Sequence, residues 1–513
     1  MSANASTEHG YGTVQRGDVE DGKPFSDDAV RQVDDNGATS QSSSVHVQDG
    51  VRRVEAITSV WSKNTMAVMF ILRRASAWKC LRPQNSIYGV GHIGAQHVVQ
   101  VVYADMTTLR NRMLLFGLLQ LPTVAATFGG PRIADLFRTH ASFRWAFGAF
   151  CVIVPVFAAP VVVVFFCSKR KAQREGKFPE RVKTRSYWES VKHYAVEFDV
   201  VGMFLTIFGW SLLLLPFSLV QYAPHGWRTG YIIAMIVVGI VLLTGFVVWE
   251  RFFATVQYFP FKHLKDRSVL GACLVYGFMF LSIFTWDTYY YSYLQVVHDL
   301  SITNASYVLI AFSLMSSIIG PLTGVLIRYH GYYKWPSIGM TPFAALGTAL
   351  LVYFRTPSSH VGYLVMCQLF NGIYSGVWAI TAQLAIMANI THQETAVALA
   401  LYGLFGSIGA AIGQAIAGGI WTNTLPQELY KNLPAELKSN ATEIYADITL
   451  QLSYPMGSSA RDAIILSYGR VQRIFVIVGC SFLPLCILCL FLWRNINVRD
   501  MELTERRKKG NVL

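Results

Sequence analysis

Charged residues are scarce in this sequence. Asp, Glu, Lys and Arg make up 14% of its 513 residues, whereas soluble domains carry about 25%. Apolar residues reach 53%, the mean hydropathy is +0.38, and apolar runs of about 18 residues or more recur along the chain. Each run is long enough to cross a hydrocarbon core of about 30 Å as a helix. The scarcity of charge argues against a soluble enzyme and predicts an all-α polytopic membrane protein.

Cysteine is also sparse, and its placement excludes a disulfide framework. The eight cysteines lie mostly inside apolar runs, where they are small buried hydrophobes. Cys486 and Cys489 form a C-x-x-C within FLPLCILCLFLW, where we expect no metal and no cofactor. The sequence also lacks the convergent His/Asp/Glu or Ser/Lys set of an intramembrane active site, so we expect no enzymatic activity.

The chain contains a succession of apolar helices separated by mostly short connections. Eleven candidate spans lie near 86–104, 113–134, 144–167, 199–221, 230–249, 268–294, 303–328, 335–354, 361–387, 396–422 and 473–493. Other segments are a polar, disordered cytoplasmic-type tail at 1–56, an atypical basic segment at 57–85, long loops at 168–198 and 423–472, and a basic tail at 494–513. Helices 86–167 form one group, and helices 199–422 form the central and C-terminal group.

The basic residues are distributed unevenly between the connections. Nine Lys/Arg fall in loop 168–198 and six follow the last span, which places these segments in the cytoplasm by the positive-inside rule. Loop 423–472 then faces outside or a lumen, and Asn440 in Asn-Ala-Thr is a candidate glycosylation acceptor. The same distribution explains the net charge of +13 without nucleic acid as a partner.

Small residues are dense in several spans, most clearly in GLFGSIGAAIGQAIAGG within 396–422. They let helices approach closely in lipid, which suits both tight packing and a moving interface. No repeated polar rings of a channel occur. We therefore expect a solute carrier in the lipid bilayer.

A carboxylate interrupts the apolar stretch FTWDTYYYSYLQVV at residues 284–297. Asp287 lies about 28 Å along span 268–294, at about 1.5 Å per residue, and therefore in its outer portion. An intramembrane acid is a candidate proton site. The alternative is a solvated or paired acid within a belt of interfacial tyrosines.

Helical periodicity arranges the aromatic residues around this acid. Trp286, Tyr290 and Tyr293 fall on one face, and Asp287 and Tyr291 lie beside it, one turn apart. We expect Asp287, Tyr290 and Tyr291 to contribute to a substrate or proton pathway.

Several stretches resemble the fungal siderophore–iron transporters of the major facilitator superfamily, which have fourteen spans. The matching stretches are YADMTTLRNR (103–112), FGGP (128–131), FRWAFGAF (143–150), EFDVVG (197–202), WDTYYYSYLQVV (286–297) and QLSYPMGSSARDAIILSYGRVQ (451–472). The resemblance covers residues 86–500. It implies a major facilitator fold and uptake of ferric siderophores, often hydroxamates, in symport with protons.

The resemblance also indicates missing spans. SKNTMAVMFIL (62–72) resembles the start of the family's first span but is too short to cross, and the basic RRASAWKCLRPQNS (73–86) follows it. Charged groups at a helix centre cost about 2.5–3.5 kcal/mol each on insertion scales. Segment 57–85 is therefore expected to be a remnant of the first span. About eleven helices of a fourteen-span architecture remain, with an incomplete N-terminal half.

Other polar residues at depth are candidates for the pathway of such a ligand. His92 and Gln96 are four residues apart on one helix, and Asn371 and Tyr374 share a face of another helix that also carries Gln383. Amide and aromatic donors suit a carbonyl-rich siderophore. Hydrogen bonds between helices are the alternative role.

In this family, the outer loop before the last span is associated with ligand capture through aromatic residues. The matching positions here are Tyr454, Arg461 and Tyr468. Tyrosine combines a rigid apolar plane with a hydroxyl group, which suits capture. The alternative is a loop that caps the bundle.

Together these features predict a ferric siderophore:proton symporter in the plasma membrane or an endosomal vesicle membrane. Loss of the first spans would impair its transport. Two alternatives stay open. One is a drug or glutathione proton antiporter on the same scaffold. The other is a truncated membrane protein that binds ligand without transporting it.

Overall fold

The computed structural model describes residues 91–501, except for positions 92, 95, 102, 105–106, 108, 141–142, 176–186, 256–258, 260 and 391–393. The predicted tail 1–56, the segment 57–85 and most of the tail 494–513 lie outside the described residues. The same holds for His92 and for part of the predicted span 86–104.

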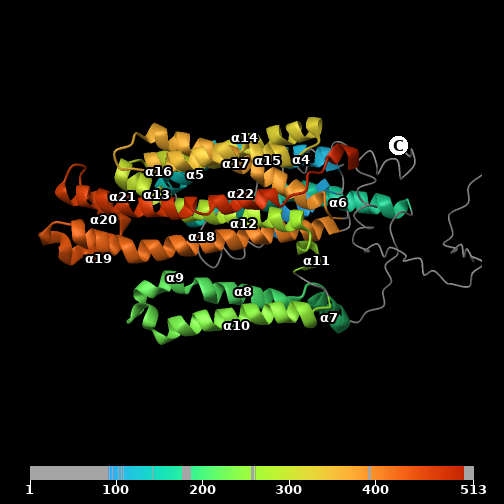
Figure 1. Ribbon diagram of the computed structural model, residues 1–513, viewed down its shortest axis with the longest axis horizontal. Coiled ribbons are helices and arrows are strands. Elements are labelled where there is room, and N and C mark those ends of the chain that lie inside the picture. Colours follow the sequence, from blue (N-terminus) through green and yellow to red (C-terminus); the bar gives the residue numbers. More distant parts are fainter. Residues whose placement is uncertain are drawn as a thin grey trace, which may run out of the picture. The chain divides into compact units, whose positions relative to one another are not determined.

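Ten helical stretches in the described residues are long and apolar enough to cross a membrane, and they correspond to ten of the eleven predicted spans (Figure 1). The chain is therefore a multi-pass α-helical membrane protein. Several stretches are broken into two helices at a proline or a tight turn. In chain order the helices are α4 (Leu109–Leu118), α5 (Leu121–His140), α6 (Phe143–Arg174), α8 (Val200–Leu214), α9 (Pro216–Leu219), α10 (Gly230–Phe252), α12 (Arg267–Asp287), α13 (Tyr290–His298), α14 (Ile302–His330), α15 (Lys334–Gly339), α16 (Thr341–Phe354), α17 (Val361–Met387), α18 (Thr395–Asn432), α21 (Ser459–Cys480) and α22 (Leu483–Phe491).

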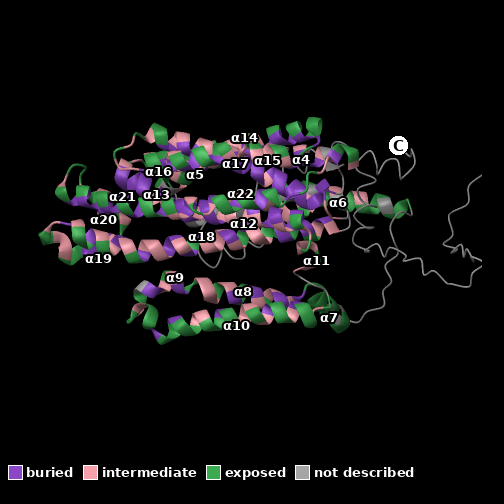
Figure 2. Ribbon diagram, viewed as in Figure 1, coloured by how far each residue is buried: buried purple, intermediate pink, exposed green. Residues whose placement is uncertain are grey.

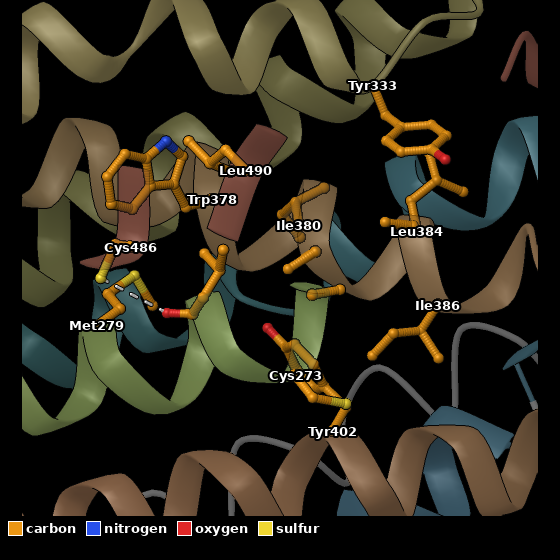
Figure 3. Packing of buried hydrophobic residues seen from close by; sticks show 14 of the residues in the cluster. Cys273, Met279, Tyr333, Trp378, Ile380, Leu384, Ile386, Tyr402, Cys486 and Leu490 are labelled. Atoms are coloured by element: carbon orange, nitrogen blue, oxygen red, sulfur yellow. Dashed lines mark hydrogen bonds between the residues drawn. The ribbon is translucent and has the colours of Figure 1, made fainter. Parts of the chain in front are cut away.

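The core lies mainly among the helices from α12 onward, where α12 packs against α18 and α14 packs against α17, and α4 joins it by packing against α14. Figure 3 shows Trp378 of α17 beside Leu490 of α22, and the Cys486 Sγ lies 3.9 Å from the Val275 carbonyl oxygen of α12. In the most apolar 18 residues of the span Arg267–His298, 67% of the residues are buried, whereas only 11% are buried in the same length of α10. Figure 2 accordingly shows α10 mostly exposed. Its apolar side chains suit contact with lipid.

The small residues of α18 lie at its contact with α12. Gly409 faces the backbone of Gly277, and a Cβ on Gly413 would lie 2.5 Å from the Leu281 carbonyl oxygen. Backbones this close leave no space for a side chain. The glycine-rich stretch therefore forms a close helix–helix interface in the described structure.

The outer connection before the last span is shorter than the predicted loop 423–472. Helix α18 continues to Asn432, and α21 begins at Ser459. Between them lie η5 (Ala435–Asn440), α19 (Ala441–Ala446) and α20 (Ile448–Ser453). The extensions are polar, so hydropathy did not detect them. They are held together by Asn432 Nδ2, which donates to Ser467 Oγ at 3.0 Å, and by the Arg470–Glu428 ion pair. We call the end of the bundle with residues 433–458 the outer end, and the end with the basic loops the inner end.

Candidate functional site

Asp287 lies at a break in its span. Helix α12 ends at Asp287 and α13 begins at Tyr290, and the Thr288 hydroxyl turns back to the Phe284 carbonyl oxygen. The Asp287 side chain is half-buried and forms no hydrogen bond or ion pair with any described residue. A carboxylate without a partner in an apolar helix end is well placed to accept a proton.

The cation that acts on Asp287 is Arg355, directly after α16. Its side chain is buried, with 2% exposure. Its Nη1 donates to the Trp286 carbonyl oxygen at 2.5 Å and to Gln472 Oε1 at 3.4 Å, and its guanidinium lies 3.8 Å from the centroid of the Tyr290 ring. Arg355 and Asp287 therefore attract each other without forming a direct ion pair.

Several buried donors around Arg355 lack acceptors in the described structure. They are Nε and Nη2 of Arg355, the indole N–H of Trp286, and the hydroxyls of Tyr290 and Tyr293. Trp286, Tyr290 and Tyr293 are all buried. The Arg355 guanidinium lies 5.2 Å from the centroid of the Trp286 ring, and the Tyr290 and Tyr293 rings stack with centroids 6.1 Å apart. An unsatisfied buried donor costs about 1–3 kcal/mol. The cluster is therefore suited to a ligand that supplies acceptor oxygens.

Tyr291 lies apart from these donors. Its hydroxyl donates to the Ile302 carbonyl oxygen at 3.3 Å, which ties α13 to the start of α14. The structure thus brings Asp287 and Tyr290 together around Arg355 and gives Tyr291 a structural contact at the adjoining turn.

Arg461 and Tyr468, predicted for ligand capture, are buried on helix α21. Arg461 Nη1 donates to the Gln451 carbonyl oxygen at 2.6 Å, and the Tyr468 hydroxyl donates to Gln451 Oε1 at 2.6 Å. Arg461 Nη2 lies 3.6 Å from Asp299 Oδ1, at the end of α13. These contacts hold the outer segment onto α21 and α13. Tyr454 is half-buried, so of the three residues its ring is the most accessible to a ligand.

An aromatic stack adjoins this outer segment. The Tyr289 and Trp421 rings are parallel, with centroids 4.2 Å apart, and Phe475 stacks on Tyr289 at 5.8 Å. Nearby, burial raises the pKa of Tyr445 to about 12, so its phenol stays neutral at physiological pH. Flat apolar surface therefore lies next to the Arg355 cluster, through Tyr289 at the α12–α13 break.

The other predicted pathway residues that the structure describes lie on other helices than Asp287. Asn371 Nδ2 donates to the Gly347 carbonyl oxygen at 3.1 Å, and the Tyr374 ring packs against Trp378 at 5.0 Å. Gln383 is buried further along α17, and Gln96 is half-buried. Asn371 therefore serves the contact between α17 and α16 in this structure.

Asn440 is exposed at the end of η5. This accessibility is what a glycosylation acceptor requires. Within the described ranges, no three His, Cys, Asp or Glu side chains gather to hold a metal ion.

The sequence reasoning missed Arg355 and Gln472. Arg355 directly follows an apolar span, in a short connection. Its contact with Trp286 joins residues 69 positions apart, and no local pattern encodes such a contact. The available signal was its position, because a single arginine after an apolar run at the outer end is unusual under the positive-inside rule.

Comparisons with known proteins agree with this architecture. Residues 225–414 match the Major Facilitator Superfamily. The chain is 46% identical to "MFS siderochrome iron transporter 1" of Ajellomyces capsulatus, over 83% of this chain and 73% of the relative. It is 32% identical to "Siderophore iron transporter mirB" of Emericella nidulans, over 92% of this chain and 91% of the relative. It is 38% identical to "MFS siderochrome iron transporter B" of Aspergillus fumigatus, over 83% of this chain and 69% of the relative.

Proposed function

Because the chain belongs to the fungal siderophore–iron transporter family of the major facilitator superfamily, we propose that it carries ferric siderophores across its membrane in symport with protons. The unsatisfied donors around Arg355 carry this proposal. A ferric siderophore presents many carbonyl and other oxygen acceptors on a large body of little net charge. Hydrogen-bond donors beside flat aromatic rings are the complementary surface.

Asp287 is the residue to which we assign proton coupling. It lies beside Arg355 but has no direct partner, so a proton can neutralise it without breaking a contact. Driving one proton inward gains about 2.3 kcal/mol per 100 mV of membrane potential. Each pH unit across the membrane adds about 1.4 kcal/mol. The sum is enough to accumulate a neutral substrate many-fold.

The test is uptake of radioactive iron, supplied as a loaded hydroxamate siderophore, by cells that lack their own siderophore carriers. We expect the wild-type chain to accumulate iron at acidic external pH and to stop when a protonophore is added. Asp287→Asn should retain surface binding and lose accumulation. Tyr291→Phe is the matched control, because it removes one hydrogen bond from the same segment and leaves the Arg355 cluster intact.

The outcomes separate the two parts of the proposal. No specific siderophore uptake by the wild-type chain, together with proton-dependent drug export, would replace the substrate assignment with the antiporter alternative. Uptake that continues with protonophore and in the Asp287→Asn variant would keep the substrate and remove the proton.

A binding protein without transport is a second candidate, and one observation favours it. The alignment with the Emericella nidulans relative extends over 551 positions, more than the 513 residues of the chain. It therefore includes positions of the relative that are not matched by residues of this chain, and we infer that some of them belong to the early spans. Alternating access needs two helical halves that move against each other. Saturable siderophore binding without accumulation in wild-type cells would support this candidate.

A further inference from the structure

Helix α7 (Tyr187–Glu197) immediately precedes the first central span, and its described side chains, residues 188, 189 and 191–197, are all exposed. The large apolar side chains Trp188, Val191, Tyr194 and Phe198 are 76%, 44%, 52% and 67% exposed. Phe198 extends the helix, since its N–H donates to the Tyr194 carbonyl oxygen at 2.9 Å. The apolar surface of α7 is therefore not buried by the described part of the protein, and we expect it to contact something else.

Most apolar side chains of α7 gather on one face, and the charged side chains lie on the rest of the helix, where Val196 is the apolar exception at 45% exposure. At 100° per residue, Trp188, Val191, Tyr194, Ala195 and Phe198 fall within an arc of about 120°. The opposite face carries Glu189, His193 and Glu197 together with Val196, and Lys192 borders the apolar arc next to Trp188. His193 Nε2 lies 3.3 Å from Glu197 Oε2. This is the pattern of a helix at an apolar–water boundary.

A fixed corner separates α7 from the membrane-spanning helix. Asp199 adopts a left-handed backbone with φ 42° and ψ 60°, which interrupts the helix after Phe198. Its Oδ1 accepts hydrogen bonds from the Gly202 N–H at 3.2 Å and from Trp249 Nε1 of α10 at 2.8 Å. The corner is thereby anchored to both α8 and α10, and Figure 1 places α7 at the end of this pair.

The position of this corner indicates that lipid contacts the apolar face of α7. The span Val200–Leu219 begins one residue after Asp199, and α7 is only about 16 Å long at 1.5 Å per residue. Every residue of α7 therefore lies within about 16 Å of this end of the span. This is the inner end, where Lys169, Arg170, Lys171 and Arg174 end helix α6 and can attract anionic lipid headgroups.

We propose that α7 is an interfacial helix that inserts its apolar face into the lipid at the inner end of the bundle. Trp188, Tyr194 and Phe198 anchor it at the depth where aromatic residues concentrate, about 5–10 Å into the boundary between headgroups and acyl chains. Glu189, His193 and Glu197 face water. The helix holds the start of α8 at a fixed depth, through the Asp199 corner.

The test is a spin-label scan of residues 188–198 in the full chain with its native cysteines replaced, reconstituted in phosphatidylcholine vesicles containing phosphatidylserine. We expect collisions with oxygen to peak at positions 188, 191, 195 and 198. Collisions with a water-soluble nickel chelate should peak at 189, 193 and 197, with a helical period near 3.6. High nickel accessibility at every position would overturn the proposal.

Exclusion of both reagents from the apolar face would also overturn it, because protein would then cover that face, as in contact with a second copy. A photo-crosslinking measurement keeps the native cysteines and does not depend on the substituted background. A photoreactive amino acid at position 191 should form phospholipid adducts, and the same group at position 189 should form few. Equal phospholipid labelling at both positions would contradict the assigned orientation.

Discussion

The crossing between α4 and α14 supports a quantitative prediction. It joins a helix of the N-terminal group to the C-terminal bundle, and two glycines make it close. A Cβ on Gly324 would lie 2.7 Å from Leu114 Cα and 2.8 Å from the Met113 carbonyl oxygen. A Cβ on Gly117 would lie 2.6 Å from Pro321 Cα. Carbon atoms prefer separations of about 3.5–4.0 Å, so Gly324→Ala forces the helices apart by about 1 Å.

The expected magnitude follows from two opposing effects. Overpacking of this kind costs about 1–3 kcal/mol, because backbone atoms cannot rotate away as a flexible side chain can. Replacing a glycine by alanine inside a helix returns about 0.5–1 kcal/mol. We therefore expect Gly324→Ala to lower the free energy of unfolding by about 1–2 kcal/mol. Gly403→Ala in α18 is the matched control. No atom lies within 4 Å of its added Cβ, so it should be neutral or slightly stabilising.

The assay is thermal unfolding of the purified variants in nanodiscs, with siderophore uptake as a second readout. Gly324→Ala should lower the unfolding midpoint and Gly403→Ala should leave it unchanged or raise it. If both variants unfold at or above the wild-type temperature, α4 does not pack on α14 at this distance. The contact between the two helical groups would then be wrong.

The remaining predictions concern the outer segment and the α7 corner. Arg461→Met removes a buried charge-assisted hydrogen bond to Gln451 and should destabilise residues 433–458 by about 2–3 kcal/mol. Limited proteolysis of this segment should then be faster. Asp299→Asn changes a side chain that is 63% exposed, so it should lower stability by less than about 1 kcal/mol. Asp199→Ala removes a helix cap and the hydrogen bond from Trp249, and should lower the free energy of unfolding by about 2 kcal/mol. Thermal unfolding measures this effect. An unchanged midpoint would show that the corner is not anchored. Asn440→Gln should abolish a glycosidase-sensitive mobility shift on gels. Asn389, in the sequence Asn-Ile-Thr, lies at the inner end, so Asn389→Gln should leave the shift intact. The opposite pattern would invert the predicted orientation.

Hydropathy predicted the spans well because lipid imposes a single demand on every crossing helix. Residues inside the hydrocarbon must be apolar, and ten predicted spans coincide with helices of the described structure. The extensions of α18 and α21 escaped prediction because they lie beyond the hydrocarbon, where polar residues are tolerated. The start of α21 did have a local signal. Ser458 accepts from the Arg461 N–H at 3.2 Å, and Asp462 lies in the first turn, the pattern of a helix N-terminus.

The grouping of aromatic residues near Asp287 had a signal in the sequence, because helical periodicity puts Trp286, Tyr290 and Tyr293 on one face. In the structure Trp286 and Tyr290 both contact the Arg355 guanidinium, and Tyr290 stacks on Tyr293. Arg355 was not predictable. Its side chain turns back into the bundle to reach the Trp286 carbonyl oxygen. A contact between distant parts of the chain depends on how α16, α12 and α21 pack, and one sequence without relatives carries no record of that packing.

The arrangement of Asp287 and Arg355 gives the proposed cycle a physical basis. Two opposite charges at one helix end would gain from direct contact, yet they remain apart, and Arg355 retains two N–H groups without acceptors. Each group can therefore be satisfied by a different partner, Asp287 by a proton and Arg355 by the oxygens of the chelate. Binding of the chelate alone leaves Asp287 charged, and binding of the proton alone leaves Arg355 donors without acceptors. Either state is costly in an apolar setting. When the chelate and the proton are both bound, Asp287 is neutral and the Arg355 donors have acceptors. In the proposed cycle the helices therefore move when both are bound, and this requirement couples transport of the chelate to that of the proton.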